Sequence, residues 1–345
     1  PLLHFCLPSI VMMIFTSIYG VVDGLFVSNF VGKIPFAAIN LVMPFIMILG
    51  GFGFMIGTGG SALIAKTLGE GRHKLANRYF SMLIIMTVIL GLFLTTIGIV
   101  FARRVSILLG ATDVMLDDCV IYLRTVLLFI SPFMLQNVFQ SFLVTAQKPH
   151  AGLIVTIIAG LTNMSLDALF IVVFRWGVAG AALATGISQC IGGLLPLILF
   201  LGKNDSLLHL VPTRLEWRPF FLSCTNGMSE LMGNISSSIV SMLYNFQLLN
   251  YAGENGIAAY GVLMYVQFIF IAVFFGYTIG VGPVIGYHYG AGNHAELKNL
   301  LRKSLKLNII TGISMTILAN LFAGALSRIF VGYDPELYTM TKSAF

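Results

Sequence analysis

The sequence predicts an all-α membrane protein built from two parallel six-helix repeats, and three observations carry this prediction. Of the 345 residues, 58% are hydrophobic and only 9% are charged, whereas a soluble domain carries about 25% charged residues. About nine apolar runs reach the roughly 20 residues that a helix needs to cross a bilayer. The chain also matches itself at an offset of 221 residues.

The apolar runs predict the order of the membrane helices. We expect them at 5–31, 36–65, 79–102, 119–146, 152–174, 179–201, 219–251, 257–287 and 305–331, with a further one beginning near Tyr338. Prolines inside these runs remove a backbone donor, so each is a candidate kink. They are Pro8, Pro44, Pro132, Pro196 and Pro283.

Lys and Arg concentrate in every second loop, as around Arg72, Lys148, Arg214 and Lys298. The positive-inside rule places these loops, and with them the N-terminus, in the cytoplasm. Topology therefore explains the net charge of +6, and we expect no nucleic-acid partner.

The internal match defines the predicted architecture. Residues Gly69–His73 fall on Gly290–His294, and segments 31–117 and 252–338 share 19 identities in 87 ungapped pairs. Each unit holds six helices, an even number, so both units enter the membrane from the same side, as parallel repeats do. We expect a first lobe at 1–202, a cytoplasmic linker at 203–218, and an incomplete second lobe at 219–345 that holds about three and a half helices.

Three acidic residues lie inside apolar runs: Asp23, Asp167 and Glu230. A carboxylate at membrane depth costs roughly 3 kcal/mol, so each is a candidate functional residue. At a rise of 1.5 Å per residue, Asp23 and Asp167 lie roughly 10–12 Å below the outer boundary, and Thr185 lies at a similar depth. Asn163 is one turn from Asp167 on the same helix face.

Two carboxylates close together either share a proton or hold a cation between them. Asp23, Asn163, Asp167 and Thr185 are therefore predicted to couple transport to sodium ions or protons. Asp23, Asn163 and Asp167 would be the metal ligands in the sodium case. The alternative is that both aspartates cap polar helix contacts or face water. Asp23 falls on Tyr244 at the repeat offset, and a carboxylate that does not recur favours function over scaffold.

Glu230 leaves two interpretations open. The first is a second acidic site that attracts cations, and the alternative is a solvated residue at a cavity mouth. Its repeat partner is Ser9.

Four segments carry a family resemblance: 22–27 (VDGLFV), 68–71 (LGEG), 163–170 (NMSLDALF) and 177–185 (GVAGAALAT). Together with the repeat, they resemble the multidrug and toxic compound extrusion (MATE) family over the whole chain. The resemblance implies a V-shaped twelve-helix transporter of the bacterial inner membrane, of which this chain would be a fragment. It implies export of cationic amphiphilic drugs in exchange for sodium ions or protons.

The resemblance also implies residue roles. It adds Tyr122 to the coupling positions, and it makes the first helix, with Pro8 fifteen residues before Asp23, a helix that bends. Apart from the coupling ion we expect no cofactor. We expect a monomer whose partners are the drug and membrane lipid.

Two rival functions remain. A lipid-linked saccharide flippase of the same superfamily would need Arg or Lys in its cavity, and the charges at mid-membrane here are acidic. An intramembrane aspartyl enzyme resembles a Y-D plus G-x-G-D pattern. The only Y-D here is Tyr333-Asp334 in a loop, and G-x-G-D is absent. No P-loop is present, so ATP is not the direct energy source and the chain is not expected to be an enzyme.

Overall fold

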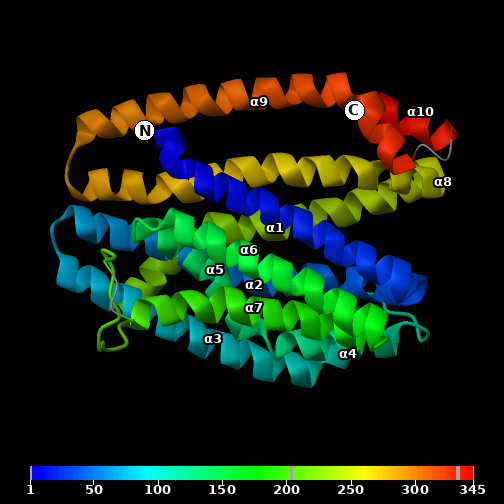
Figure 1. The fold of residues 1–345 in the computed structure, drawn as a ribbon, viewed down its shortest axis with the longest axis horizontal. Coiled ribbons are helices and arrows are strands. Elements are labelled where there is room, and N and C mark those ends of the chain that lie inside the picture. Colours follow the sequence, from blue (N-terminus) through cyan, green and yellow to red (C-terminus); the bar gives the residue numbers. More distant parts are fainter. Residues whose placement is uncertain (1, 203–204, 332–334, 345) are drawn as a thin grey trace.

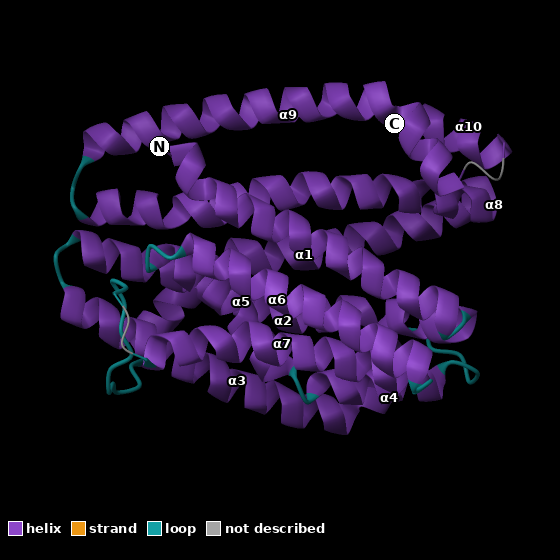
Figure 2. Cartoon of the chain, viewed as in Figure 1, coloured by secondary structure: helices purple, strands orange, loops and turns teal. Residues whose placement is uncertain are grey.

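The computed structural model describes residues 2–202, 205–331 and 335–344, and this part of the chain contains helices and no strands (Figures 1 and 2). The helices are α1 (Leu2–Phe30), α2 (Lys33–Gly69), α3 (His73–Leu108), α4 (Leu116–Leu127), α5 (Ile130–Thr145), α6 (Pro149–Asp167), the π-helix η1 (Ala168–Val173), α7 (Gly177–Leu201), α8 (Trp217–Gly290), α9 (His294–Val331) and α10 (Pro335–Ala344). Residues 203–204 of the expected linker lie outside the described residues.

Within the described residues, seven helices are long and apolar enough to cross a membrane, or up to eight if one bent pair counts as a single span. That pair is α4 and α5, which meet at 57°, so the run predicted at 119–146 is divided into two helices beside Pro132, the candidate kink. Pro132 supplies the physical reason, because it has no N–H to donate to Leu128 one turn earlier.

The helices predicted at 219–251 and 257–287 both fall within α8, which the structure assigns as helix from Trp217 to Gly290. Ser223 and Tyr287 both contact α2, at Gly59 and Gly69. In a straight helix they would lie about 96 Å apart, whereas the two α2 positions are about 15 Å apart. The chain of α8 must therefore double back, as Figure 1 shows. The segment 219–251 is not among the candidate spans.

Helix α5 lies at the centre of the bundle, because nearly all of its side chains are buried. Its polar residues are satisfied partly by neighbouring helices. The amide Nδ2 of Asn137 donates to the Gly50 carbonyl at 3.0 Å, and the hydroxyls of Ser61 and Thr145 are 2.7 Å apart. These bonds fix α5 against α2.

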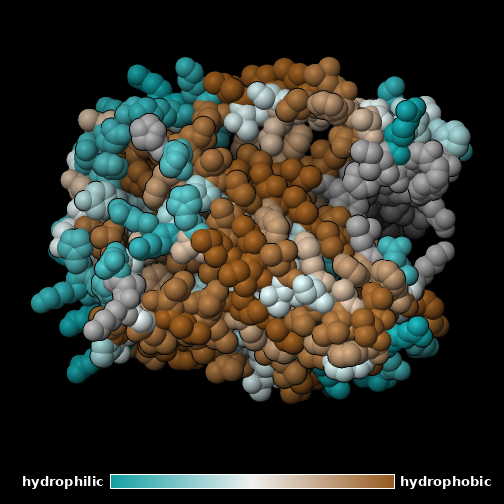
Figure 3. Space-filling model, viewed as in Figure 1, coloured by the Kyte–Doolittle hydropathy of each residue, from teal (hydrophilic) through white to brown (hydrophobic). Residues whose placement is uncertain are grey.

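The loops on either side of the bundle differ in charge. The turns after α2, α5, α7 and α8 gather at one end of the molecule in Figure 1, and hydrophilic side chains crowd that end in Figure 3, with an apolar band beside them. We call it the basic end, because it carries Arg72, Lys148, Arg214 and Lys298.

Helix boundaries recur at the 221-residue offset. Helix α2 ends at Gly69 and α8 ends at Gly290, while α3 begins at His73 and α9 begins at His294. The glycine between each pair adopts a positive φ, 77° at Gly71 and 68° at Gly292, a conformation that glycine reaches without strain.

Near the basic end, α2 and α8 approach each other backbone to backbone. A Cβ added to Gly59 would overlap the Ser223 carbonyl oxygen, and a Cβ added to Gly227 would overlap the Met55 carbonyl oxygen. Small residues allow this close approach between membrane helices. We call this contact the glycine seam; it also includes Gly69 and Gly290, where an added Cβ would overlap the carbonyl oxygens of Tyr287 and Lys66.

Candidate functional site

The carboxyl groups of Asp23 and Asp167 lie together in the interior. Asp23 is on α1 and Asp167 is the last residue of α6, two helices that pack against each other. The side chains are close enough for a hydrogen bond between them when one holds a proton. Asp167 is fully buried, and neither of its oxygens has a protein donor. The pair therefore needs a proton or a cation to be stable.

Three further predicted residues surround the pair. Tyr122 of α4 is buried near both carboxylates, and its hydroxyl faces Thr185 of α7. Asn163 lies one turn before Asp167 and is 2% exposed. The side-chain oxygens of Asn163 and Thr185 are buried without a hydrogen bond of standard geometry. Four elements thus bring oxygen atoms with unused lone pairs to one place.

Sequence reasoning missed two polar neighbours of this cluster. Tyr19, one helical turn before Asp23, lies near its carboxylate and hydrogen-bonds to Gln136 of the central helix α5. The spacing of four residues between Tyr19 and Asp23 was the available signal. Gln136 could have been found as a buried amide inside an apolar run, where polar residues are expensive.

The backbone changes register directly after Asp167. Helix α6 ends there and the π-helix η1 continues from Ala168 to Val173. Short π-helical segments inside α-helices are frequent at functional sites. The bond from the Phe174 N–H to the Leu169 carbonyl, at 2.9 Å, has the wider π spacing. Asp167 therefore lies at the junction of two helical registers.

The chemistry of the cluster suits a small hard ion. Carboxylate, amide and hydroxyl oxygens are the ligands that hard cations prefer. Among the described residues no group of three or more His, Cys, Asp or Glu side chains could hold a metal, so a cation here would depend on Asn163 and hydroxyl ligands as well. The unused oxygens fit either a sodium ion or a shared proton.

Glu230 is not part of this cluster. It is half-buried on α8, next to Leu231, which approaches Gly51 of α2. On α1, Gly24 lies beside Asp23 and approaches Phe36 of α2. The fifteen α2 residues between these contacts correspond to roughly 22 Å at 1.5 Å per residue. Glu230 thus lies well toward the basic end.

Carboxylates inside a bundle of membrane-length helices are typical of transport proteins, and the fold and the cluster together point to this class. A comparison with protein families agrees, since residues 8–169 and 231–344 match the family MatE. The chain belongs to the MatE family, whose members are transporters and not enzymes.

Similar proteins carry export names. The chain is 27% identical over 345 residues to the multidrug export protein MepA of Staphylococcus haemolyticus, covering 98% of this chain and 75% of that protein. It is 28% identical over 306 residues to MepA of Staphylococcus saprophyticus, covering 87% of this chain and 66% of that protein. The chain is thus shorter than the relatives it matches.

Solved structures share the fold. An outward-facing multidrug resistance MATE transporter of the MOP superfamily superposes with a TM-score of 0.93 at 21% identity, over 99% of this chain and 76% of that one. A MATE transporter in a straight conformation gives 0.92 at 21% identity, and one in a bent conformation gives 0.88 at 21% identity, each over 99% of this chain and 76% of the other.

Proposed function

We propose that the protein exports cationic amphiphilic compounds in exchange for sodium ions or protons, as a secondary-active multidrug transporter. The observation that carries the proposal is the interior pair of Asp23 and Asp167, in which both oxygens of Asp167 and Oδ1 of Asp23 are buried without a hydrogen-bond partner. The relatives' name, multidrug export protein, supports export as the direction and drugs as the cargo. The acidic interior suits a cationic substrate and disfavours a pyrophosphate-linked saccharide.

The coupling follows from the state of the carboxylate pair. Asp23, Asn163, Asp167, Thr185 and Tyr122 hold the ion on one side of the membrane and release it on the other. An ion can shift the transporter only by binding one conformation more tightly than the other. Asp23 provides this difference, because it is on α1 whereas most of its partners are on α4, α6 and α7.

A bend of α1 is the proposed link between ion and conformation. Pro8 is inside α1 and leaves the carbonyl one turn earlier without its helical partner. The adjacent segment packs on α8, where Gly276 approaches Ser9 and Ile10. Movement of α1 around Pro8 therefore changes the Asp23 site and the contact with α8 together.

The two-lobe architecture is supported by reciprocal contacts. Gly69 contacts Tyr287, and Gly290 contacts Lys66; each contact becomes the other when 221 residues are added or subtracted. The same holds for Gly59 with Gly227 and Gly280 with Cys6. Reciprocal pairs of this kind indicate a two-fold relation between surfaces. They support parallel repeats, with lobes at 1–202 and 219–345.

We infer a location in the bacterial plasma membrane as a multi-pass monomer. The gathering of basic loops at one end supports a cytoplasmic basic end and N-terminus. With the basic end closed by the glycine seam, the described conformation corresponds to one that opens on the opposite side.

The test is export of a fluorescent cation from proteoliposomes, using the full-length protein, with sodium and pH gradients imposed separately. Asp23→Asn keeps size and removes charge, so it should abolish gradient-driven export while leaving insertion intact. Asp167→Asn should do the same. The double variant should be little worse than either, because the two residues act as one unit.

Asp113→Asn is the matched control, because Asp113 is exposed in the loop between α3 and α4. It should export like wild type at equal expression. If both aspartate variants of the cluster still respond to the gradient, the coupling site lies elsewhere and Glu230 becomes the leading candidate.

A further inference from the structure

Two cavities meet on the outer surface of the bundle near the basic end. The first is an open pocket of about 510 Å³ lined by Arg78, Pro212, Thr213, Arg214 and Glu216. The second is an apolar groove of about 460 Å³. It includes Ile85, Val88 and Ile89 of α3, Leu197 and Leu201 of α7, and Pro212. Pro212 lines both, so the polar pocket and the apolar groove are continuous.

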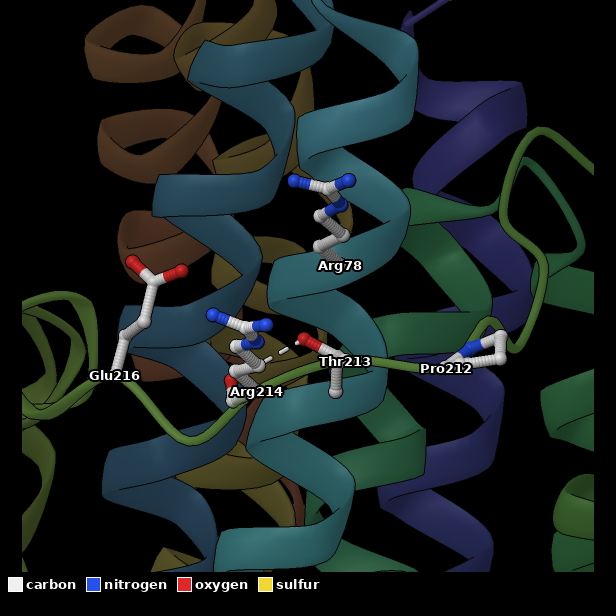
Figure 4. A pocket seen from close by; sticks show the side chains of 5 residues that line it. All are labelled: Arg78, Pro212, Thr213, Arg214 and Glu216. Atoms are coloured by element: carbon white, nitrogen blue, oxygen red, sulfur yellow. Dashed lines mark hydrogen bonds between the residues drawn. The ribbon is translucent and has the colours of Figure 1, made fainter.

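The chain segment before α8 lines both cavities. The His209 N–H donates to the Asn77 side-chain oxygen at 3.1 Å, and the Val211 N–H donates to the Ser81 hydroxyl at 2.9 Å. These bonds hold residues 209–211 along α3. The fixed segment places Arg214 over the same pocket as Arg78, as Figure 4 shows.

The polar pocket has an excess of positive charge. Arg78 and Arg214 are exposed there with one carboxylate, Glu216. Neither arginine forms an ion pair with any carboxylate among the described residues. The guanidinium groups therefore have donors available, and their planar geometry matches phosphate oxygens.

The charged pocket lies at a position along α3 that matches the membrane interface. Trp217, exposed on the first turn of α8, packs against Phe220 and Phe221, and such aromatic residues gather at headgroup level. Ile85 and Ile89 lie about 10 and 17 Å further along α3 than Arg78. The charged pocket is thus at the height of a lipid headgroup, and the groove descends from it into the apolar layer.

We propose that this composite site binds one anionic phospholipid. Its phosphate interacts with Arg78 and Arg214, and one acyl chain lies in the groove between α3 and α7. Basic pockets beside membrane helices on the cytoplasmic side are suited to anionic headgroups. The bound lipid fixes the linker to α3, at the place where the first six helices connect to α8. The proposal does not depend on the identity of the transported compound.

Native mass spectrometry of the full-length protein titrated with phosphatidylglycerol or phosphatidylcholine tests the site. Phosphatidylglycerol should bind more tightly, and Arg78→Gln and Arg214→Gln should each weaken it about five-fold, since a basic residue near a membrane surface contributes about 1 kcal/mol. Val88→Trp should also weaken it by filling the groove. Arg103→Gln, at the opposite end of α3, is the matched control and should bind like wild type.

Three results would overturn the proposal. Equal binding of both lipids, insensitive to the arginine variants, would indicate ordinary lipid contact. Loss of binding in the arginine variants but not in Val88→Trp, with displacement by inorganic phosphate, would indicate a free-anion site. Weakening by Arg103→Gln equal to that by Arg78→Gln would indicate a general charge effect. Far-ultraviolet circular dichroism and size-exclusion profiles verify that each variant is folded.

Discussion

A single methyl group at the glycine seam should shift the balance between conformations of the protein. In the described conformation, a Cβ on Gly59 would overlap the Ser223 carbonyl oxygen and lie 2.6 Å from the Gly227 nitrogen. Ordinary contacts begin near 3.5 Å, so α2 and α8 would have to separate by more than about 1 Å. Overpacking of this kind costs about 1–3 kcal/mol.

That cost falls only on conformations in which the seam is closed. Gly59→Ala should therefore raise the population with the basic end open by about 5- to 150-fold relative to wild type. Spin labels at Lys74 and Lys298, exposed at the starts of α3 and α9, would report the separation of the basic end by double electron–electron resonance. The variant should populate longer distances.

Gly233→Ala is the matched control. Gly233 is also on α8, but an added Cβ there meets nothing within 4 Å. Removing a helical glycine should then stabilise the protein by roughly 0.5–1 kcal/mol and leave the distances unchanged. If Gly59→Ala gives the distance distribution and melting temperature of Gly233→Ala, the seam does not resist opening and the reasoning is wrong.

Three smaller predictions concern export and stability. Pro8→Ala restores a helical backbone donor in α1 and should reduce ion-driven export with protein level unchanged; normal export with normal ion dependence would exclude the bend. Asn137→Ala removes the hydrogen bond that the Gly50 carbonyl accepts in addition to that from its helical partner and leaves a cavity in the buried helix α5; it should lower the free energy of unfolding by about 1–3 kcal/mol, measured by thermal unfolding in detergent. Ser61→Ala should cost less, about 0.5–1.5 kcal/mol, because Thr145 keeps its bond to the Ser141 carbonyl; an effect equal to that of Asn137→Ala would contradict this ranking.

The sequence was sufficient for the fold class because hydropathy dictates it. Membrane-length apolar runs report burial in lipid directly, and the all-helical structure and family confirm that class. It was not sufficient for helix breaks. The run at 119–146 contains Pro132, but sequence alone does not tell whether a proline bends a helix slightly or divides it, since this depends on the packing of α4 and α5.

For the candidate site, the sequence predicted only the depth of each residue in the membrane, which follows from counting residues along its helix. Counting placed Asp23, Asp167 and Thr185 at one level, and the structure places them in one cluster. Tyr19 could have been found from its spacing of four residues to Asp23 on the same helix, whereas nothing in the sequence of α5 shows that Gln136 faces Tyr19. The π-helix after Asp167 was also missed, since segment 168–173 is apolar and carries no local signal for the wider register.

The contact between Gly59 and Gly227 occurs a second time in the molecule, between the corresponding residues Gly280 and Cys6. Gly59 meets a glycine, Gly227, whereas the corresponding Gly280 meets Cys6, whose Sγ would lie 2.9 Å from an added Cβ. The same backbone crossing thus exists twice, once with glycine on both helices and once with glycine on only one. Alanine substituted in turn at the two positions would compare one contact in two side-chain contexts within a single chain. Few proteins allow helix packing to be measured against an internal standard of this kind.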